Sequence, residues 1–319
     1  MAKKQTAQSC TTDEIAQIWL ADIRVSVKES TYARYYRLVH KYILPRLGSM
    51  HLKDIDSLCL NRFTEQLLKS GGLRKQKLAP KTVTDVLCVV KSILKFARLQ
   101  GYSCPGVDGM RLPPKTPRNI RVLSGENRQM LENLLLNKDD TVSLGILLSL
   151  FTGLRIGEVC GLQWGDIDQQ AQLLFVRRTV GRIADLDPDS VKRTKVIVSE
   201  PKTTSSYRII PLPKFLGEVL HDNVHDPQTY ILSGTREPME PHCFYSRYQR
   251  LMAANKLSGY SFHALRHTFA TRCVEVGFDT KSLSEILGHT NISTTLAFYV
   301  HPSMEQKRQQ MEKLTPVCL

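Results

Sequence analysis

Hydrophobic residues in the first hundred positions repeat with the period of an α-helix. In residues 13–28, Ile15, Trp19, Ile23 and Val27 recur at every fourth position, which places them on one face of a helix. Three further segments show this pattern and are bounded by helix signals such as a serine N-cap, a first-turn proline or a final glycine. They run from Ser30 to near Pro45 and Gly48, from Ser57 to Gly71-Gly72 and from Pro80 to Gly101. We therefore predict a small domain of four helices.

Residues 104–120 interrupt this helical pattern. Four prolines and two glycines fall within the stretch CPGVDGMRLPPKTPRN. Proline lacks the N–H that a helix interior or a central strand needs, so we predict an extended linker here. The chain then divides into an N-terminal extension, a helical domain, the linker, a second domain and a C-terminal tail. Their expected bounds are 1–10, 11–103, 104–120, 121–301 and 302–319.

The second domain combines helical and strand patterns. Three runs rich in β-branched residues, 173–180, 194–200 and 207–213, predict strands, and the PKTTSS between the last two predicts a hairpin turn. Helical patterns surround them, over 125–137, 141–152, 213–222, 241–254, 264–276, 280–288, 293–300 and 303–313. We therefore predict a fold that is mostly α with a small antiparallel β-sheet, the second domain being α+β.

The formal net charge is +14, and most of the excess lies in the first third of the chain. Residues 1–105 contain 18 lysines and arginines against 8 acidic residues. Such a domain suits a polyanionic partner, because each neutralised phosphate releases a counterion; a basic surface without that role is the alternative. Four candidate phosphate contacts lie between the third and fourth helices, where a solvated loop is the competing interpretation. They are Arg74, Lys75, Lys77 and Lys81.

Several classes of protein are disfavoured by the sequence. No stretch approaches the roughly 20 apolar residues of a membrane span, so we expect no membrane partner. The N-terminal segment has acidic residues where a secretory signal is apolar, which predicts a cytoplasmic location. The 8 cysteines are scattered without a C-x-x-C pair, which favours isolated thiols over a zinc module or a disulfide framework.

Three segments carry residues whose chemistry goes beyond core packing. In TGLRIGEVCGLQWGDID (152–168), Arg155 and Glu158 are three residues apart, a spacing that also occurs in ordinary surface pairs. In SFHALRHTFATRCVEVG (261–277), three polar residues fall within one helical turn. In LGHTNISTTLAFYVHP (287–302), a histidine stands at a predicted helix end and a tyrosine follows ten residues later. These residues are His263, Arg266, His267, His289 and Tyr299.

Metal and thiol chemistry are the first alternatives for these segments. His263 and His267, four residues apart, can face one zinc ion. However, the intervening Ala-Leu-Arg lacks the glutamate of a metalloprotease helix, and the guanidinium would repel a divalent cation. Cys273 lies in an amphipathic helix with nothing to lower its pKa. A phosphate-binding G-x-x-x-x-G-K-[ST] loop and a clustered carboxylate site are also absent, which agrees with a chemistry that requires neither a metal nor another cofactor.

The chemistry-bearing residues together resemble the tyrosine recombinases, the phage integrases and their relatives. The family has the order Arg, hairpin Lys, His-x-x-Arg, His, Tyr, and six residues of this chain occupy those positions. They are Arg155, Lys202, His263, Arg266, His289 and Tyr299. The contexts TGLRIGE, EPKTTSSYRIIPLP, HALRHTFAT and LGHTNISTTLAFY also match, so the resemblance covers about 121–301. It implies a SAM-like core-binding domain followed by a tyrosine recombinase catalytic domain.

The resemblance implies a role for each of these residues in cleaving a phosphodiester. Two arginines suit the non-bridging oxygens because their planar, permanently charged guanidiniums match phosphate geometry. Tyr299 would attack phosphorus and form a 3′-phosphotyrosyl link, with His263 as base, since a phenol with a pKa of about 10 needs help to ionise. Lys202 would protonate the leaving 5′ oxygen, and His289 would donate a hydrogen bond to the phosphate. Glu158 and His267 would support their neighbours.

The resemblance also implies partners and a biological setting. The two domains would clamp double-stranded DNA, and four protomers on two DNA sites would form the active assembly. The tail would either dock on a neighbouring protomer or pack on its own. Only about ten residues precede the first predicted helix, so we expect no separate arm-binding domain. A phage or mobile-element integrase, with a possible accessory directionality protein, is the favoured interpretation.

Three alternatives remain open at the level of sequence. A recombinase that resolves chromosome or plasmid dimers belongs to the same family. A type IB topoisomerase shares the phosphotyrosyl chemistry but relaxes DNA as a monomer. A non-catalytic DNA-binding regulator would keep the basic face and lose the six site residues, all of which are present here.

Overall fold

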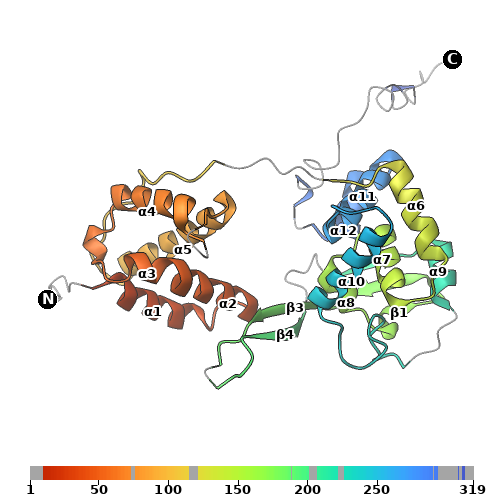
Figure 1. Ribbon diagram of the computed structural model, residues 1–319, viewed down its shortest axis with the longest axis horizontal. Coiled ribbons are helices and arrows are strands. Elements are labelled where there is room, and N and C mark those ends of the chain that lie inside the picture. Colours follow the sequence, from red (N-terminus) through yellow and green to blue (C-terminus); the bar gives the residue numbers. More distant parts are fainter. Residues whose placement is uncertain are drawn as a thin grey trace, which may run out of the picture. The chain divides into compact units, whose positions relative to one another are not determined.

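The computed structural model describes two separate units. The described residues are 10–72, 76–114, 121–187, 189–200, 207–221, 226–289, 291–293, 308, 311 and 312. Contacts along the chain group residues 1–118 and 183–195 into a first unit, and residues 119–182 and 196–319 into a second. Figure 1 labels the α-helices of both units.

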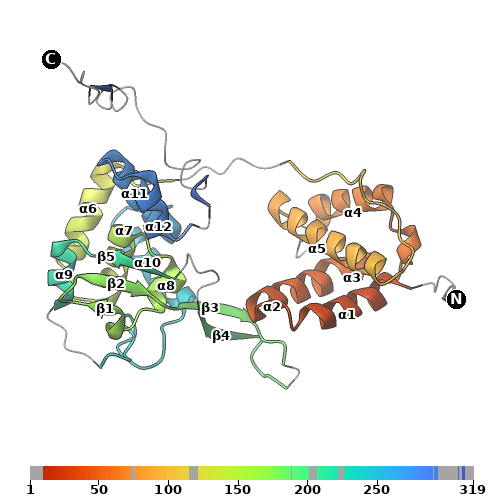
Figure 2. The same ribbon diagram turned by 180° about the vertical axis from the view of Figure 1, so that it is seen from behind.

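The first unit is helical, as its hydrophobic period predicts. Its elements are the helices α1 (Thr12–Ile23), α2 (Glu29–Leu38), η1 (Val39–Ile43), α3 (Leu44–Leu47), η2 (Leu52–Asp54), α4 (Ser57–Ser70) and α5 (Pro80–Leu99). The predicted face of α1 is buried, with Ile15 inaccessible to solvent and Trp19 4% exposed. Figure 2 shows α1, α4 and α5 packed in one bundle around this core.

One helix boundary in this unit differs from the predicted one. The first helix ends at Ile23 instead of near residue 28, because the hydroxyl of Ser26 donates to the carbonyl of Ile23 and competes with helical bonding. The second predicted helix continues past Pro45 to Leu47 and ends at Gly48, as predicted. It widens into the π-helical turn η1, where the N–H of Leu44 donates to the carbonyl of Val39, and this turn lets the chain continue into α3.

Part of the predicted linker packs on the helical core. Residues 104–114 form neither helix nor strand. Val107 and Met110 are nonetheless buried against the core of the first unit. The side chain of Asn61 on α4 fixes this segment, since it donates to the carbonyl of Gly109 and accepts from the N–H of Arg111. This part of the segment therefore contributes to the stability of the helical unit.

The second unit combines helices with two small sheets. Its helical elements are α6 (Gly125–Leu136), α7 (Thr141–Thr152), α8 (Ile156–Cys160), η4 (Trp164–Asp166), α9 (Lys214–His221), α10 (Pro241–Ala254), α11 (Phe262–Glu275) and α12 (Thr280–Leu287). The strands are β1 (Ile167–Asp168), β2 (Leu173–Val176), β3 (Thr179–Ala184), β4 (Thr194–Ser199) and β5 (Arg208–Pro211), and residues 183–184 of β3 and 194–195 of β4 are grouped with the first unit. Strands β1, β2 and β5 form an antiparallel sheet, visible in Figure 2, and β3 pairs with β4. The mostly α fold with small antiparallel sheets is confirmed.

The predicted hairpin between 194–200 and 207–213 is wrong. Strand β4 pairs with β3, whereas β5 pairs with β2, so the two runs belong to different sheets. The run 173–180 also divides at Arg177 and Arg178. Both guanidiniums bind the buried carboxylate of Asp166, at 3.3 and 2.6 Å, and this separates β2 from β3. Each half then takes a different partner strand.

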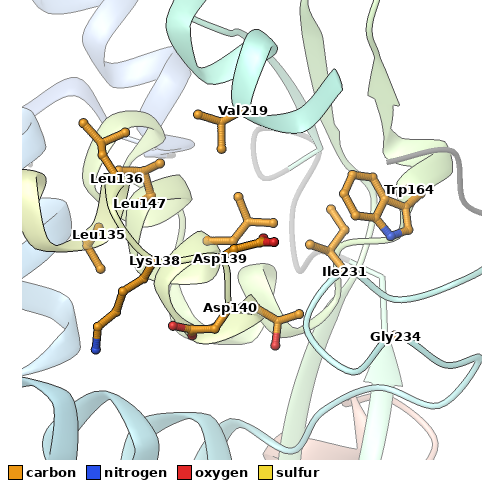
Figure 3. A pocket seen from close by; sticks show the side chains of 12 residues that line it. Leu135, Leu136, Lys138, Asp139, Asp140, Leu147, Trp164, Val219, Ile231 and Gly234 are labelled. Carbon is orange, nitrogen blue, oxygen red and sulfur yellow. The ribbon is translucent and has the colours of Figure 1, made fainter. Parts of the chain in front are cut away.

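A cavity of about 220 Å³ lies in the second unit, among apolar side chains from α6, α7 and α9 (Figure 3). Trp164 and Ile231 close one side of it, and Asp139 and Asp140 stand at the start of α7. The described chemistry-bearing residues, Arg155, His263, Arg266 and His289, are not among the described residues that line it. No helix of the described part of the chain is long and apolar enough to cross a membrane.

Candidate active site

Arg155 stands where the chain leaves α7 and enters α8. Helix α7 ends at Gly153 in the left-handed region (φ 68°), and a Cβ at that position would lie 2.7 Å from the ring of Phe269. Arg155 then forms the N-cap of α8. The carboxylate of Glu158 accepts both the backbone N–H and the Nη1 of Arg155, each at 2.8 Å. The Arg155–Glu158 pair therefore caps the N-terminus of α8, and the Glu158 carboxylate orients the Arg155 side chain.

Glu158 also binds a second arginine, which sequence reasoning missed. Arg208, the first residue of β5, donates to the two carboxylate oxygens at 3.1 and 2.9 Å, and both side chains are almost fully buried. Burial alone would raise the pKa of Glu158, but the hydrogen bond and charge of Arg208, followed by the charge of Arg155, lower it from 4.5 to about 2. Glu158 is thus ionised throughout the physiological range.

Arg266 lies on α11 with only 1% of its surface exposed. Its guanidinium donates to the carbonyl of Gly153 at 2.7 Å and to the carbonyl of Leu287 at 2.6 Å. Both carbonyls are at helix C-termini, which carry partial negative charge and stabilise a cation. A buried arginine is therefore held between the ends of α7 and α12.

His289 directly follows the glycine that ends α12. Gly288 is in the left-handed region (φ 63°), and the next residue places its Nε2 3.0 Å from Nη2 of Arg266. Because a guanidinium has no acceptor, Nε2 accepts this bond and the proton of the neutral ring is on Nδ1. Burial, followed by the charges of Arg266 and Arg155, lowers the pKa of His289 from 6.5 to about 4. The ring is therefore neutral at pH 7.

His263 and His267 lie one turn apart on α11, as predicted. Their rings meet edge to face, with centroids 4.6 Å apart. His263 is exposed, whereas His267 is partly buried. Burial, followed by the charges of His263 and Arg266, lowers the pKa of His267 from 6.5 to about 4. A neutral His267 beside the exposed ring fits a supporting role.

The structure does not describe all of the predicted site. Lys202, Tyr299, Arg74 and Lys75 lie outside the described residues.

The two remaining candidate DNA contacts are in the first unit. Lys77 is exposed. Lys81, on α5, is also exposed, and its Nζ lies 2.6 Å from Asp85, which binds Arg34 of α2 at the same distance. Exposed ion pairs contribute little to stability, so Lys81 can exchange this partner for a phosphate at small cost.

The described site residues gather an excess of positive charge at the end of α12. Arg155, Arg208 and Arg266 converge on the end of α12 with Glu158 as the carboxylate between two of them, and the neighbouring His289 is neutral. The excess positive charge suits a phosphate group. Within the described residues, no group of three or more His, Cys, Asp or Glu side chains could hold a metal ion.

Comparison with protein families identifies the family of the chain. Residues 124–306 match the model of the "Phage integrase family", and residues 11–68 match "Phage integrase, N-terminal SAM-like domain". The first match covers more than half of the chain. The chain belongs to the tyrosine recombinases of the phage integrase family. It is accordingly a site-specific DNA recombinase, an enzyme that acts by strand cleavage and rejoining.

Relatives of the recombinase match it over nearly its whole length. A tyrosine recombinase XerC-like protein of Caldanaerobacter subterraneus is 27% identical over 98% of this chain and 84% of its own. The ICEBs1 integrase of Bacillus subtilis is 21% identical, with the same coverage of both chains. The Tn1549 transposon integrase, solved in complex with transposon right end DNA, has a TM-score of 0.76 at 22% identity. It covers 95% of this chain and 99% of its own, and it shares the fold.

The residue that sequence reasoning missed has only a weak local signal. Arg208 stands in the segment YRIIPLP, where an arginine opening a strand looks like an exposed charge. Its partner Glu158 is 50 residues earlier in the chain, so no helical or strand spacing connects the two. Glu158, three positions after Arg155, could have suggested that a second basic residue lies nearby. The sequence does not show that this residue is Arg208.

Proposed function

We propose that this recombinase binds the phosphate to be cleaved between Arg155 and Arg266 and attacks it with Tyr299. The observation that carries the proposal is the convergence of the two arginines on adjacent carbonyls, Gly288 and Leu287, beside His289. Two guanidiniums that bind the carbonyls of consecutive residues lie close enough together to donate hydrogen bonds to two oxygens of one phosphate. Negative charge that develops on those oxygens during displacement is then neutralised in place.

His289 supports the phosphate through a change of hydrogen bonding. In the free enzyme its Nε2 accepts from Arg266, and its pKa of about 4 keeps it neutral. A bound phosphate adds negative charge next to both groups, which raises the pKa of the ring and draws the arginine toward the phosphate. Nε2 then takes up a proton and donates to a phosphate oxygen.

The remaining steps are assigned from the motif positions of Tyr299, Lys202 and His263. The hydroxyl of Tyr299 loses its proton to His263 and forms a bond to phosphorus, while the bond from phosphorus to the 5′ oxygen breaks. Lys202 supplies the proton that the leaving 5′ oxygen takes up. A 3′-phosphotyrosyl link replaces the phosphodiester, and a 5′ hydroxyl of another strand reverses the sequence. The energy of the bond is kept, so no nucleotide cofactor is consumed.

The substrate is double-stranded DNA, which both units bind. The excess positive charge of the first third of the chain supports this proposal, with Lys77 and Lys81 as candidate phosphate contacts. We propose that four protomers on two DNA sites form the active assembly, with the C-terminal tail exchanged between them. The enzyme acts in the cytoplasm, where its DNA substrate is.

A covalent-trapping experiment tests the chemistry. The full-length protein is incubated, with EDTA present, with a nicked suicide duplex that carries a candidate site. A protein–DNA adduct on a denaturing gel that disappears in Tyr299→Phe supports the proposal. Binding without an adduct on several validated sites would identify a DNA-binding regulator instead. Joining of strands between two duplexes then separates recombination from the relaxation of a topoisomerase.

We propose integration and excision of a phage or mobile element as the biological role. The similarity over nearly the whole chain to the ICEBs1 integrase supports it, whereas the similarity to a XerC-like recombinase supports dimer resolution as a second candidate. The trapping assay discriminates the two if element ends and chromosomal dimer-resolution sites are compared as duplexes. A requirement for an accessory directionality protein in excision alone would support the integrase role.

A further inference from the structure

The last carbonyls of α12 each accept a bond from a different arginine. Arg208 of β5 donates from Nε to Ile286 at 2.5 Å, Arg266 of α11 donates to Leu287 at 2.6 Å, and Arg155 donates to Gly288 at 3.3 Å. The final carbonyls of a helix lack intrahelical donors and carry partial negative charge. Three elements distant in sequence therefore converge on the residues directly before His289.

Arg208 differs from the other two arginines in what it can reach. Its side chain is 5% exposed, and its guanidinium donates hydrogen bonds to both carboxylate oxygens of Glu158 and to the carbonyl of Ile286 at the end of α12. It connects two structures that must cooperate in the proposed reaction. One is the Glu158 carboxylate that orients Arg155, and the other is the helix end that carries His289 and leads, ten residues later, to Tyr299.

We propose that Arg208 is a positioning residue for strand cleavage, which locks the end of α12 to the Glu158–Arg155 pair. The proposal rests on the proposed function. A guanidinium is required at this position because its planar fork binds both carboxylate oxygens and leaves Nε for the carbonyl of Ile286. A lysine supplies the charge but only one compact donor group. Misplacement of reacting groups by 1 Å can cost about 100-fold in rate.

Two substitutions separate the geometry from the charge. Arg208→Lys keeps a cation beside Glu158 and removes the triple attachment, so we expect the cleavage rate to fall while its pH profile stays as in the parent enzyme. Arg208→Gln removes the charge as well. The charged groups that act on Glu158 are Arg155 and Arg208, so burial is then opposed by Arg155 alone. We expect the pKa of Glu158 to rise, because less positive charge then faces its buried carboxylate, and the cleavage rate to fall further than in Arg208→Lys.

Single-turnover adduct formation measures these effects. The full-length protein, in excess over a nicked suicide duplex, is followed from pH 5 to pH 9, and binding to the uncleaved duplex is titrated in parallel. Arg178→Gln is the matched control, because Arg178 also binds a buried carboxylate, that of Asp166 at 2.6 Å. Fluorescence of Trp164 confirms that each variant is folded at the assay temperature.

The expected result is a split between binding and cleavage. DNA affinity stays within about twofold, Arg208→Gln lowers the adduct rate about 100-fold, and Arg208→Lys lowers it at least about tenfold. The control retains its rate. Equal rates for the folded Arg208 variants and the parent would overturn the proposal, as would the same loss in Arg178→Gln or a loss confined to binding. No adduct from the parent enzyme would instead refute the proposed function itself.

Discussion

Replacement of Glu158 by glutamine tests how strongly the charges of the site support the fold. The substitution keeps the size of the side chain and removes its charge. Its carboxylate is 5% exposed and binds two arginines, one of which, Arg208, is as deeply buried. We therefore expect Glu158→Gln to destabilise the second unit strongly, because a buried guanidinium loses its counter-charge.

The pKa of Glu158 gives the magnitude. A pKa lowered from 4.5 to about 2 corresponds to about 3 kcal/mol in favour of the ionised folded state. Removal of one partner of a buried pair independently costs about 3 to 5 kcal/mol. Since the pKa is lowered on folding, the stabilisation is complete above pH 4.5 and is lost as the pH falls toward 2. We expect a difference of about 3 kcal/mol at pH 7, which shrinks to roughly 1.5 kcal/mol at pH 3.

Urea unfolding followed by tryptophan fluorescence measures this difference. The chain has 2 tryptophans, Trp19 in the first unit and Trp164 in the second, so a Trp19→Phe background reports on the second unit alone. Asp226→Asn is the control, since Asp226 forms an exposed pair with Arg236 and should change stability little. A difference below about 1 kcal/mol at pH 7, or one that does not change with pH, would refute the reasoning.

Three further predictions concern the phosphate site and the DNA contacts. Arg266→Lys removes the fork that reaches two carbonyls at once and should lower adduct formation about 100-fold with DNA binding retained; undiminished cleavage would contradict the clamp. Lys77→Ala and Lys81→Ala should each reduce the slope of log binding constant against log salt by about 0.9; an unchanged slope excludes that contact. Because the pKa of His289 is lowered to about 4, the unfolded chain binds more protons between pH 6.5 and 4, and stability falls over that range. His289→Gln should flatten this part of a urea midpoint against pH curve, and a curve parallel to the parent's would refute the pKa.

Much of the helical framework could be predicted because it depends on local pattern. The apolar period of Ile15 and Trp19, the proline that opens α5 and the glycines that end α7 and α12 each act within a few residues. The end of a helix does not follow from its apolar period where a side chain competes with the backbone, as Ser26 does after α1. The motif segments that carry Arg155, Arg266 and His289 could likewise be identified from the sequence, because each motif is continuous along the chain.

The sequence by itself therefore determined much of the helical framework and the class of enzyme, and it supplied the residues that we propose as the reacting groups. Only the tertiary structure decided which strands pair, that Arg266 is buried between two helix ends, and that Arg208 is the partner of Glu158. The physical reason is the range of the interactions. Helical hydrogen bonds join residues four apart, whereas strand pairing and buried ion pairs join residues that may be separated by 50 positions, and nothing in their local spacing selects one partner among several.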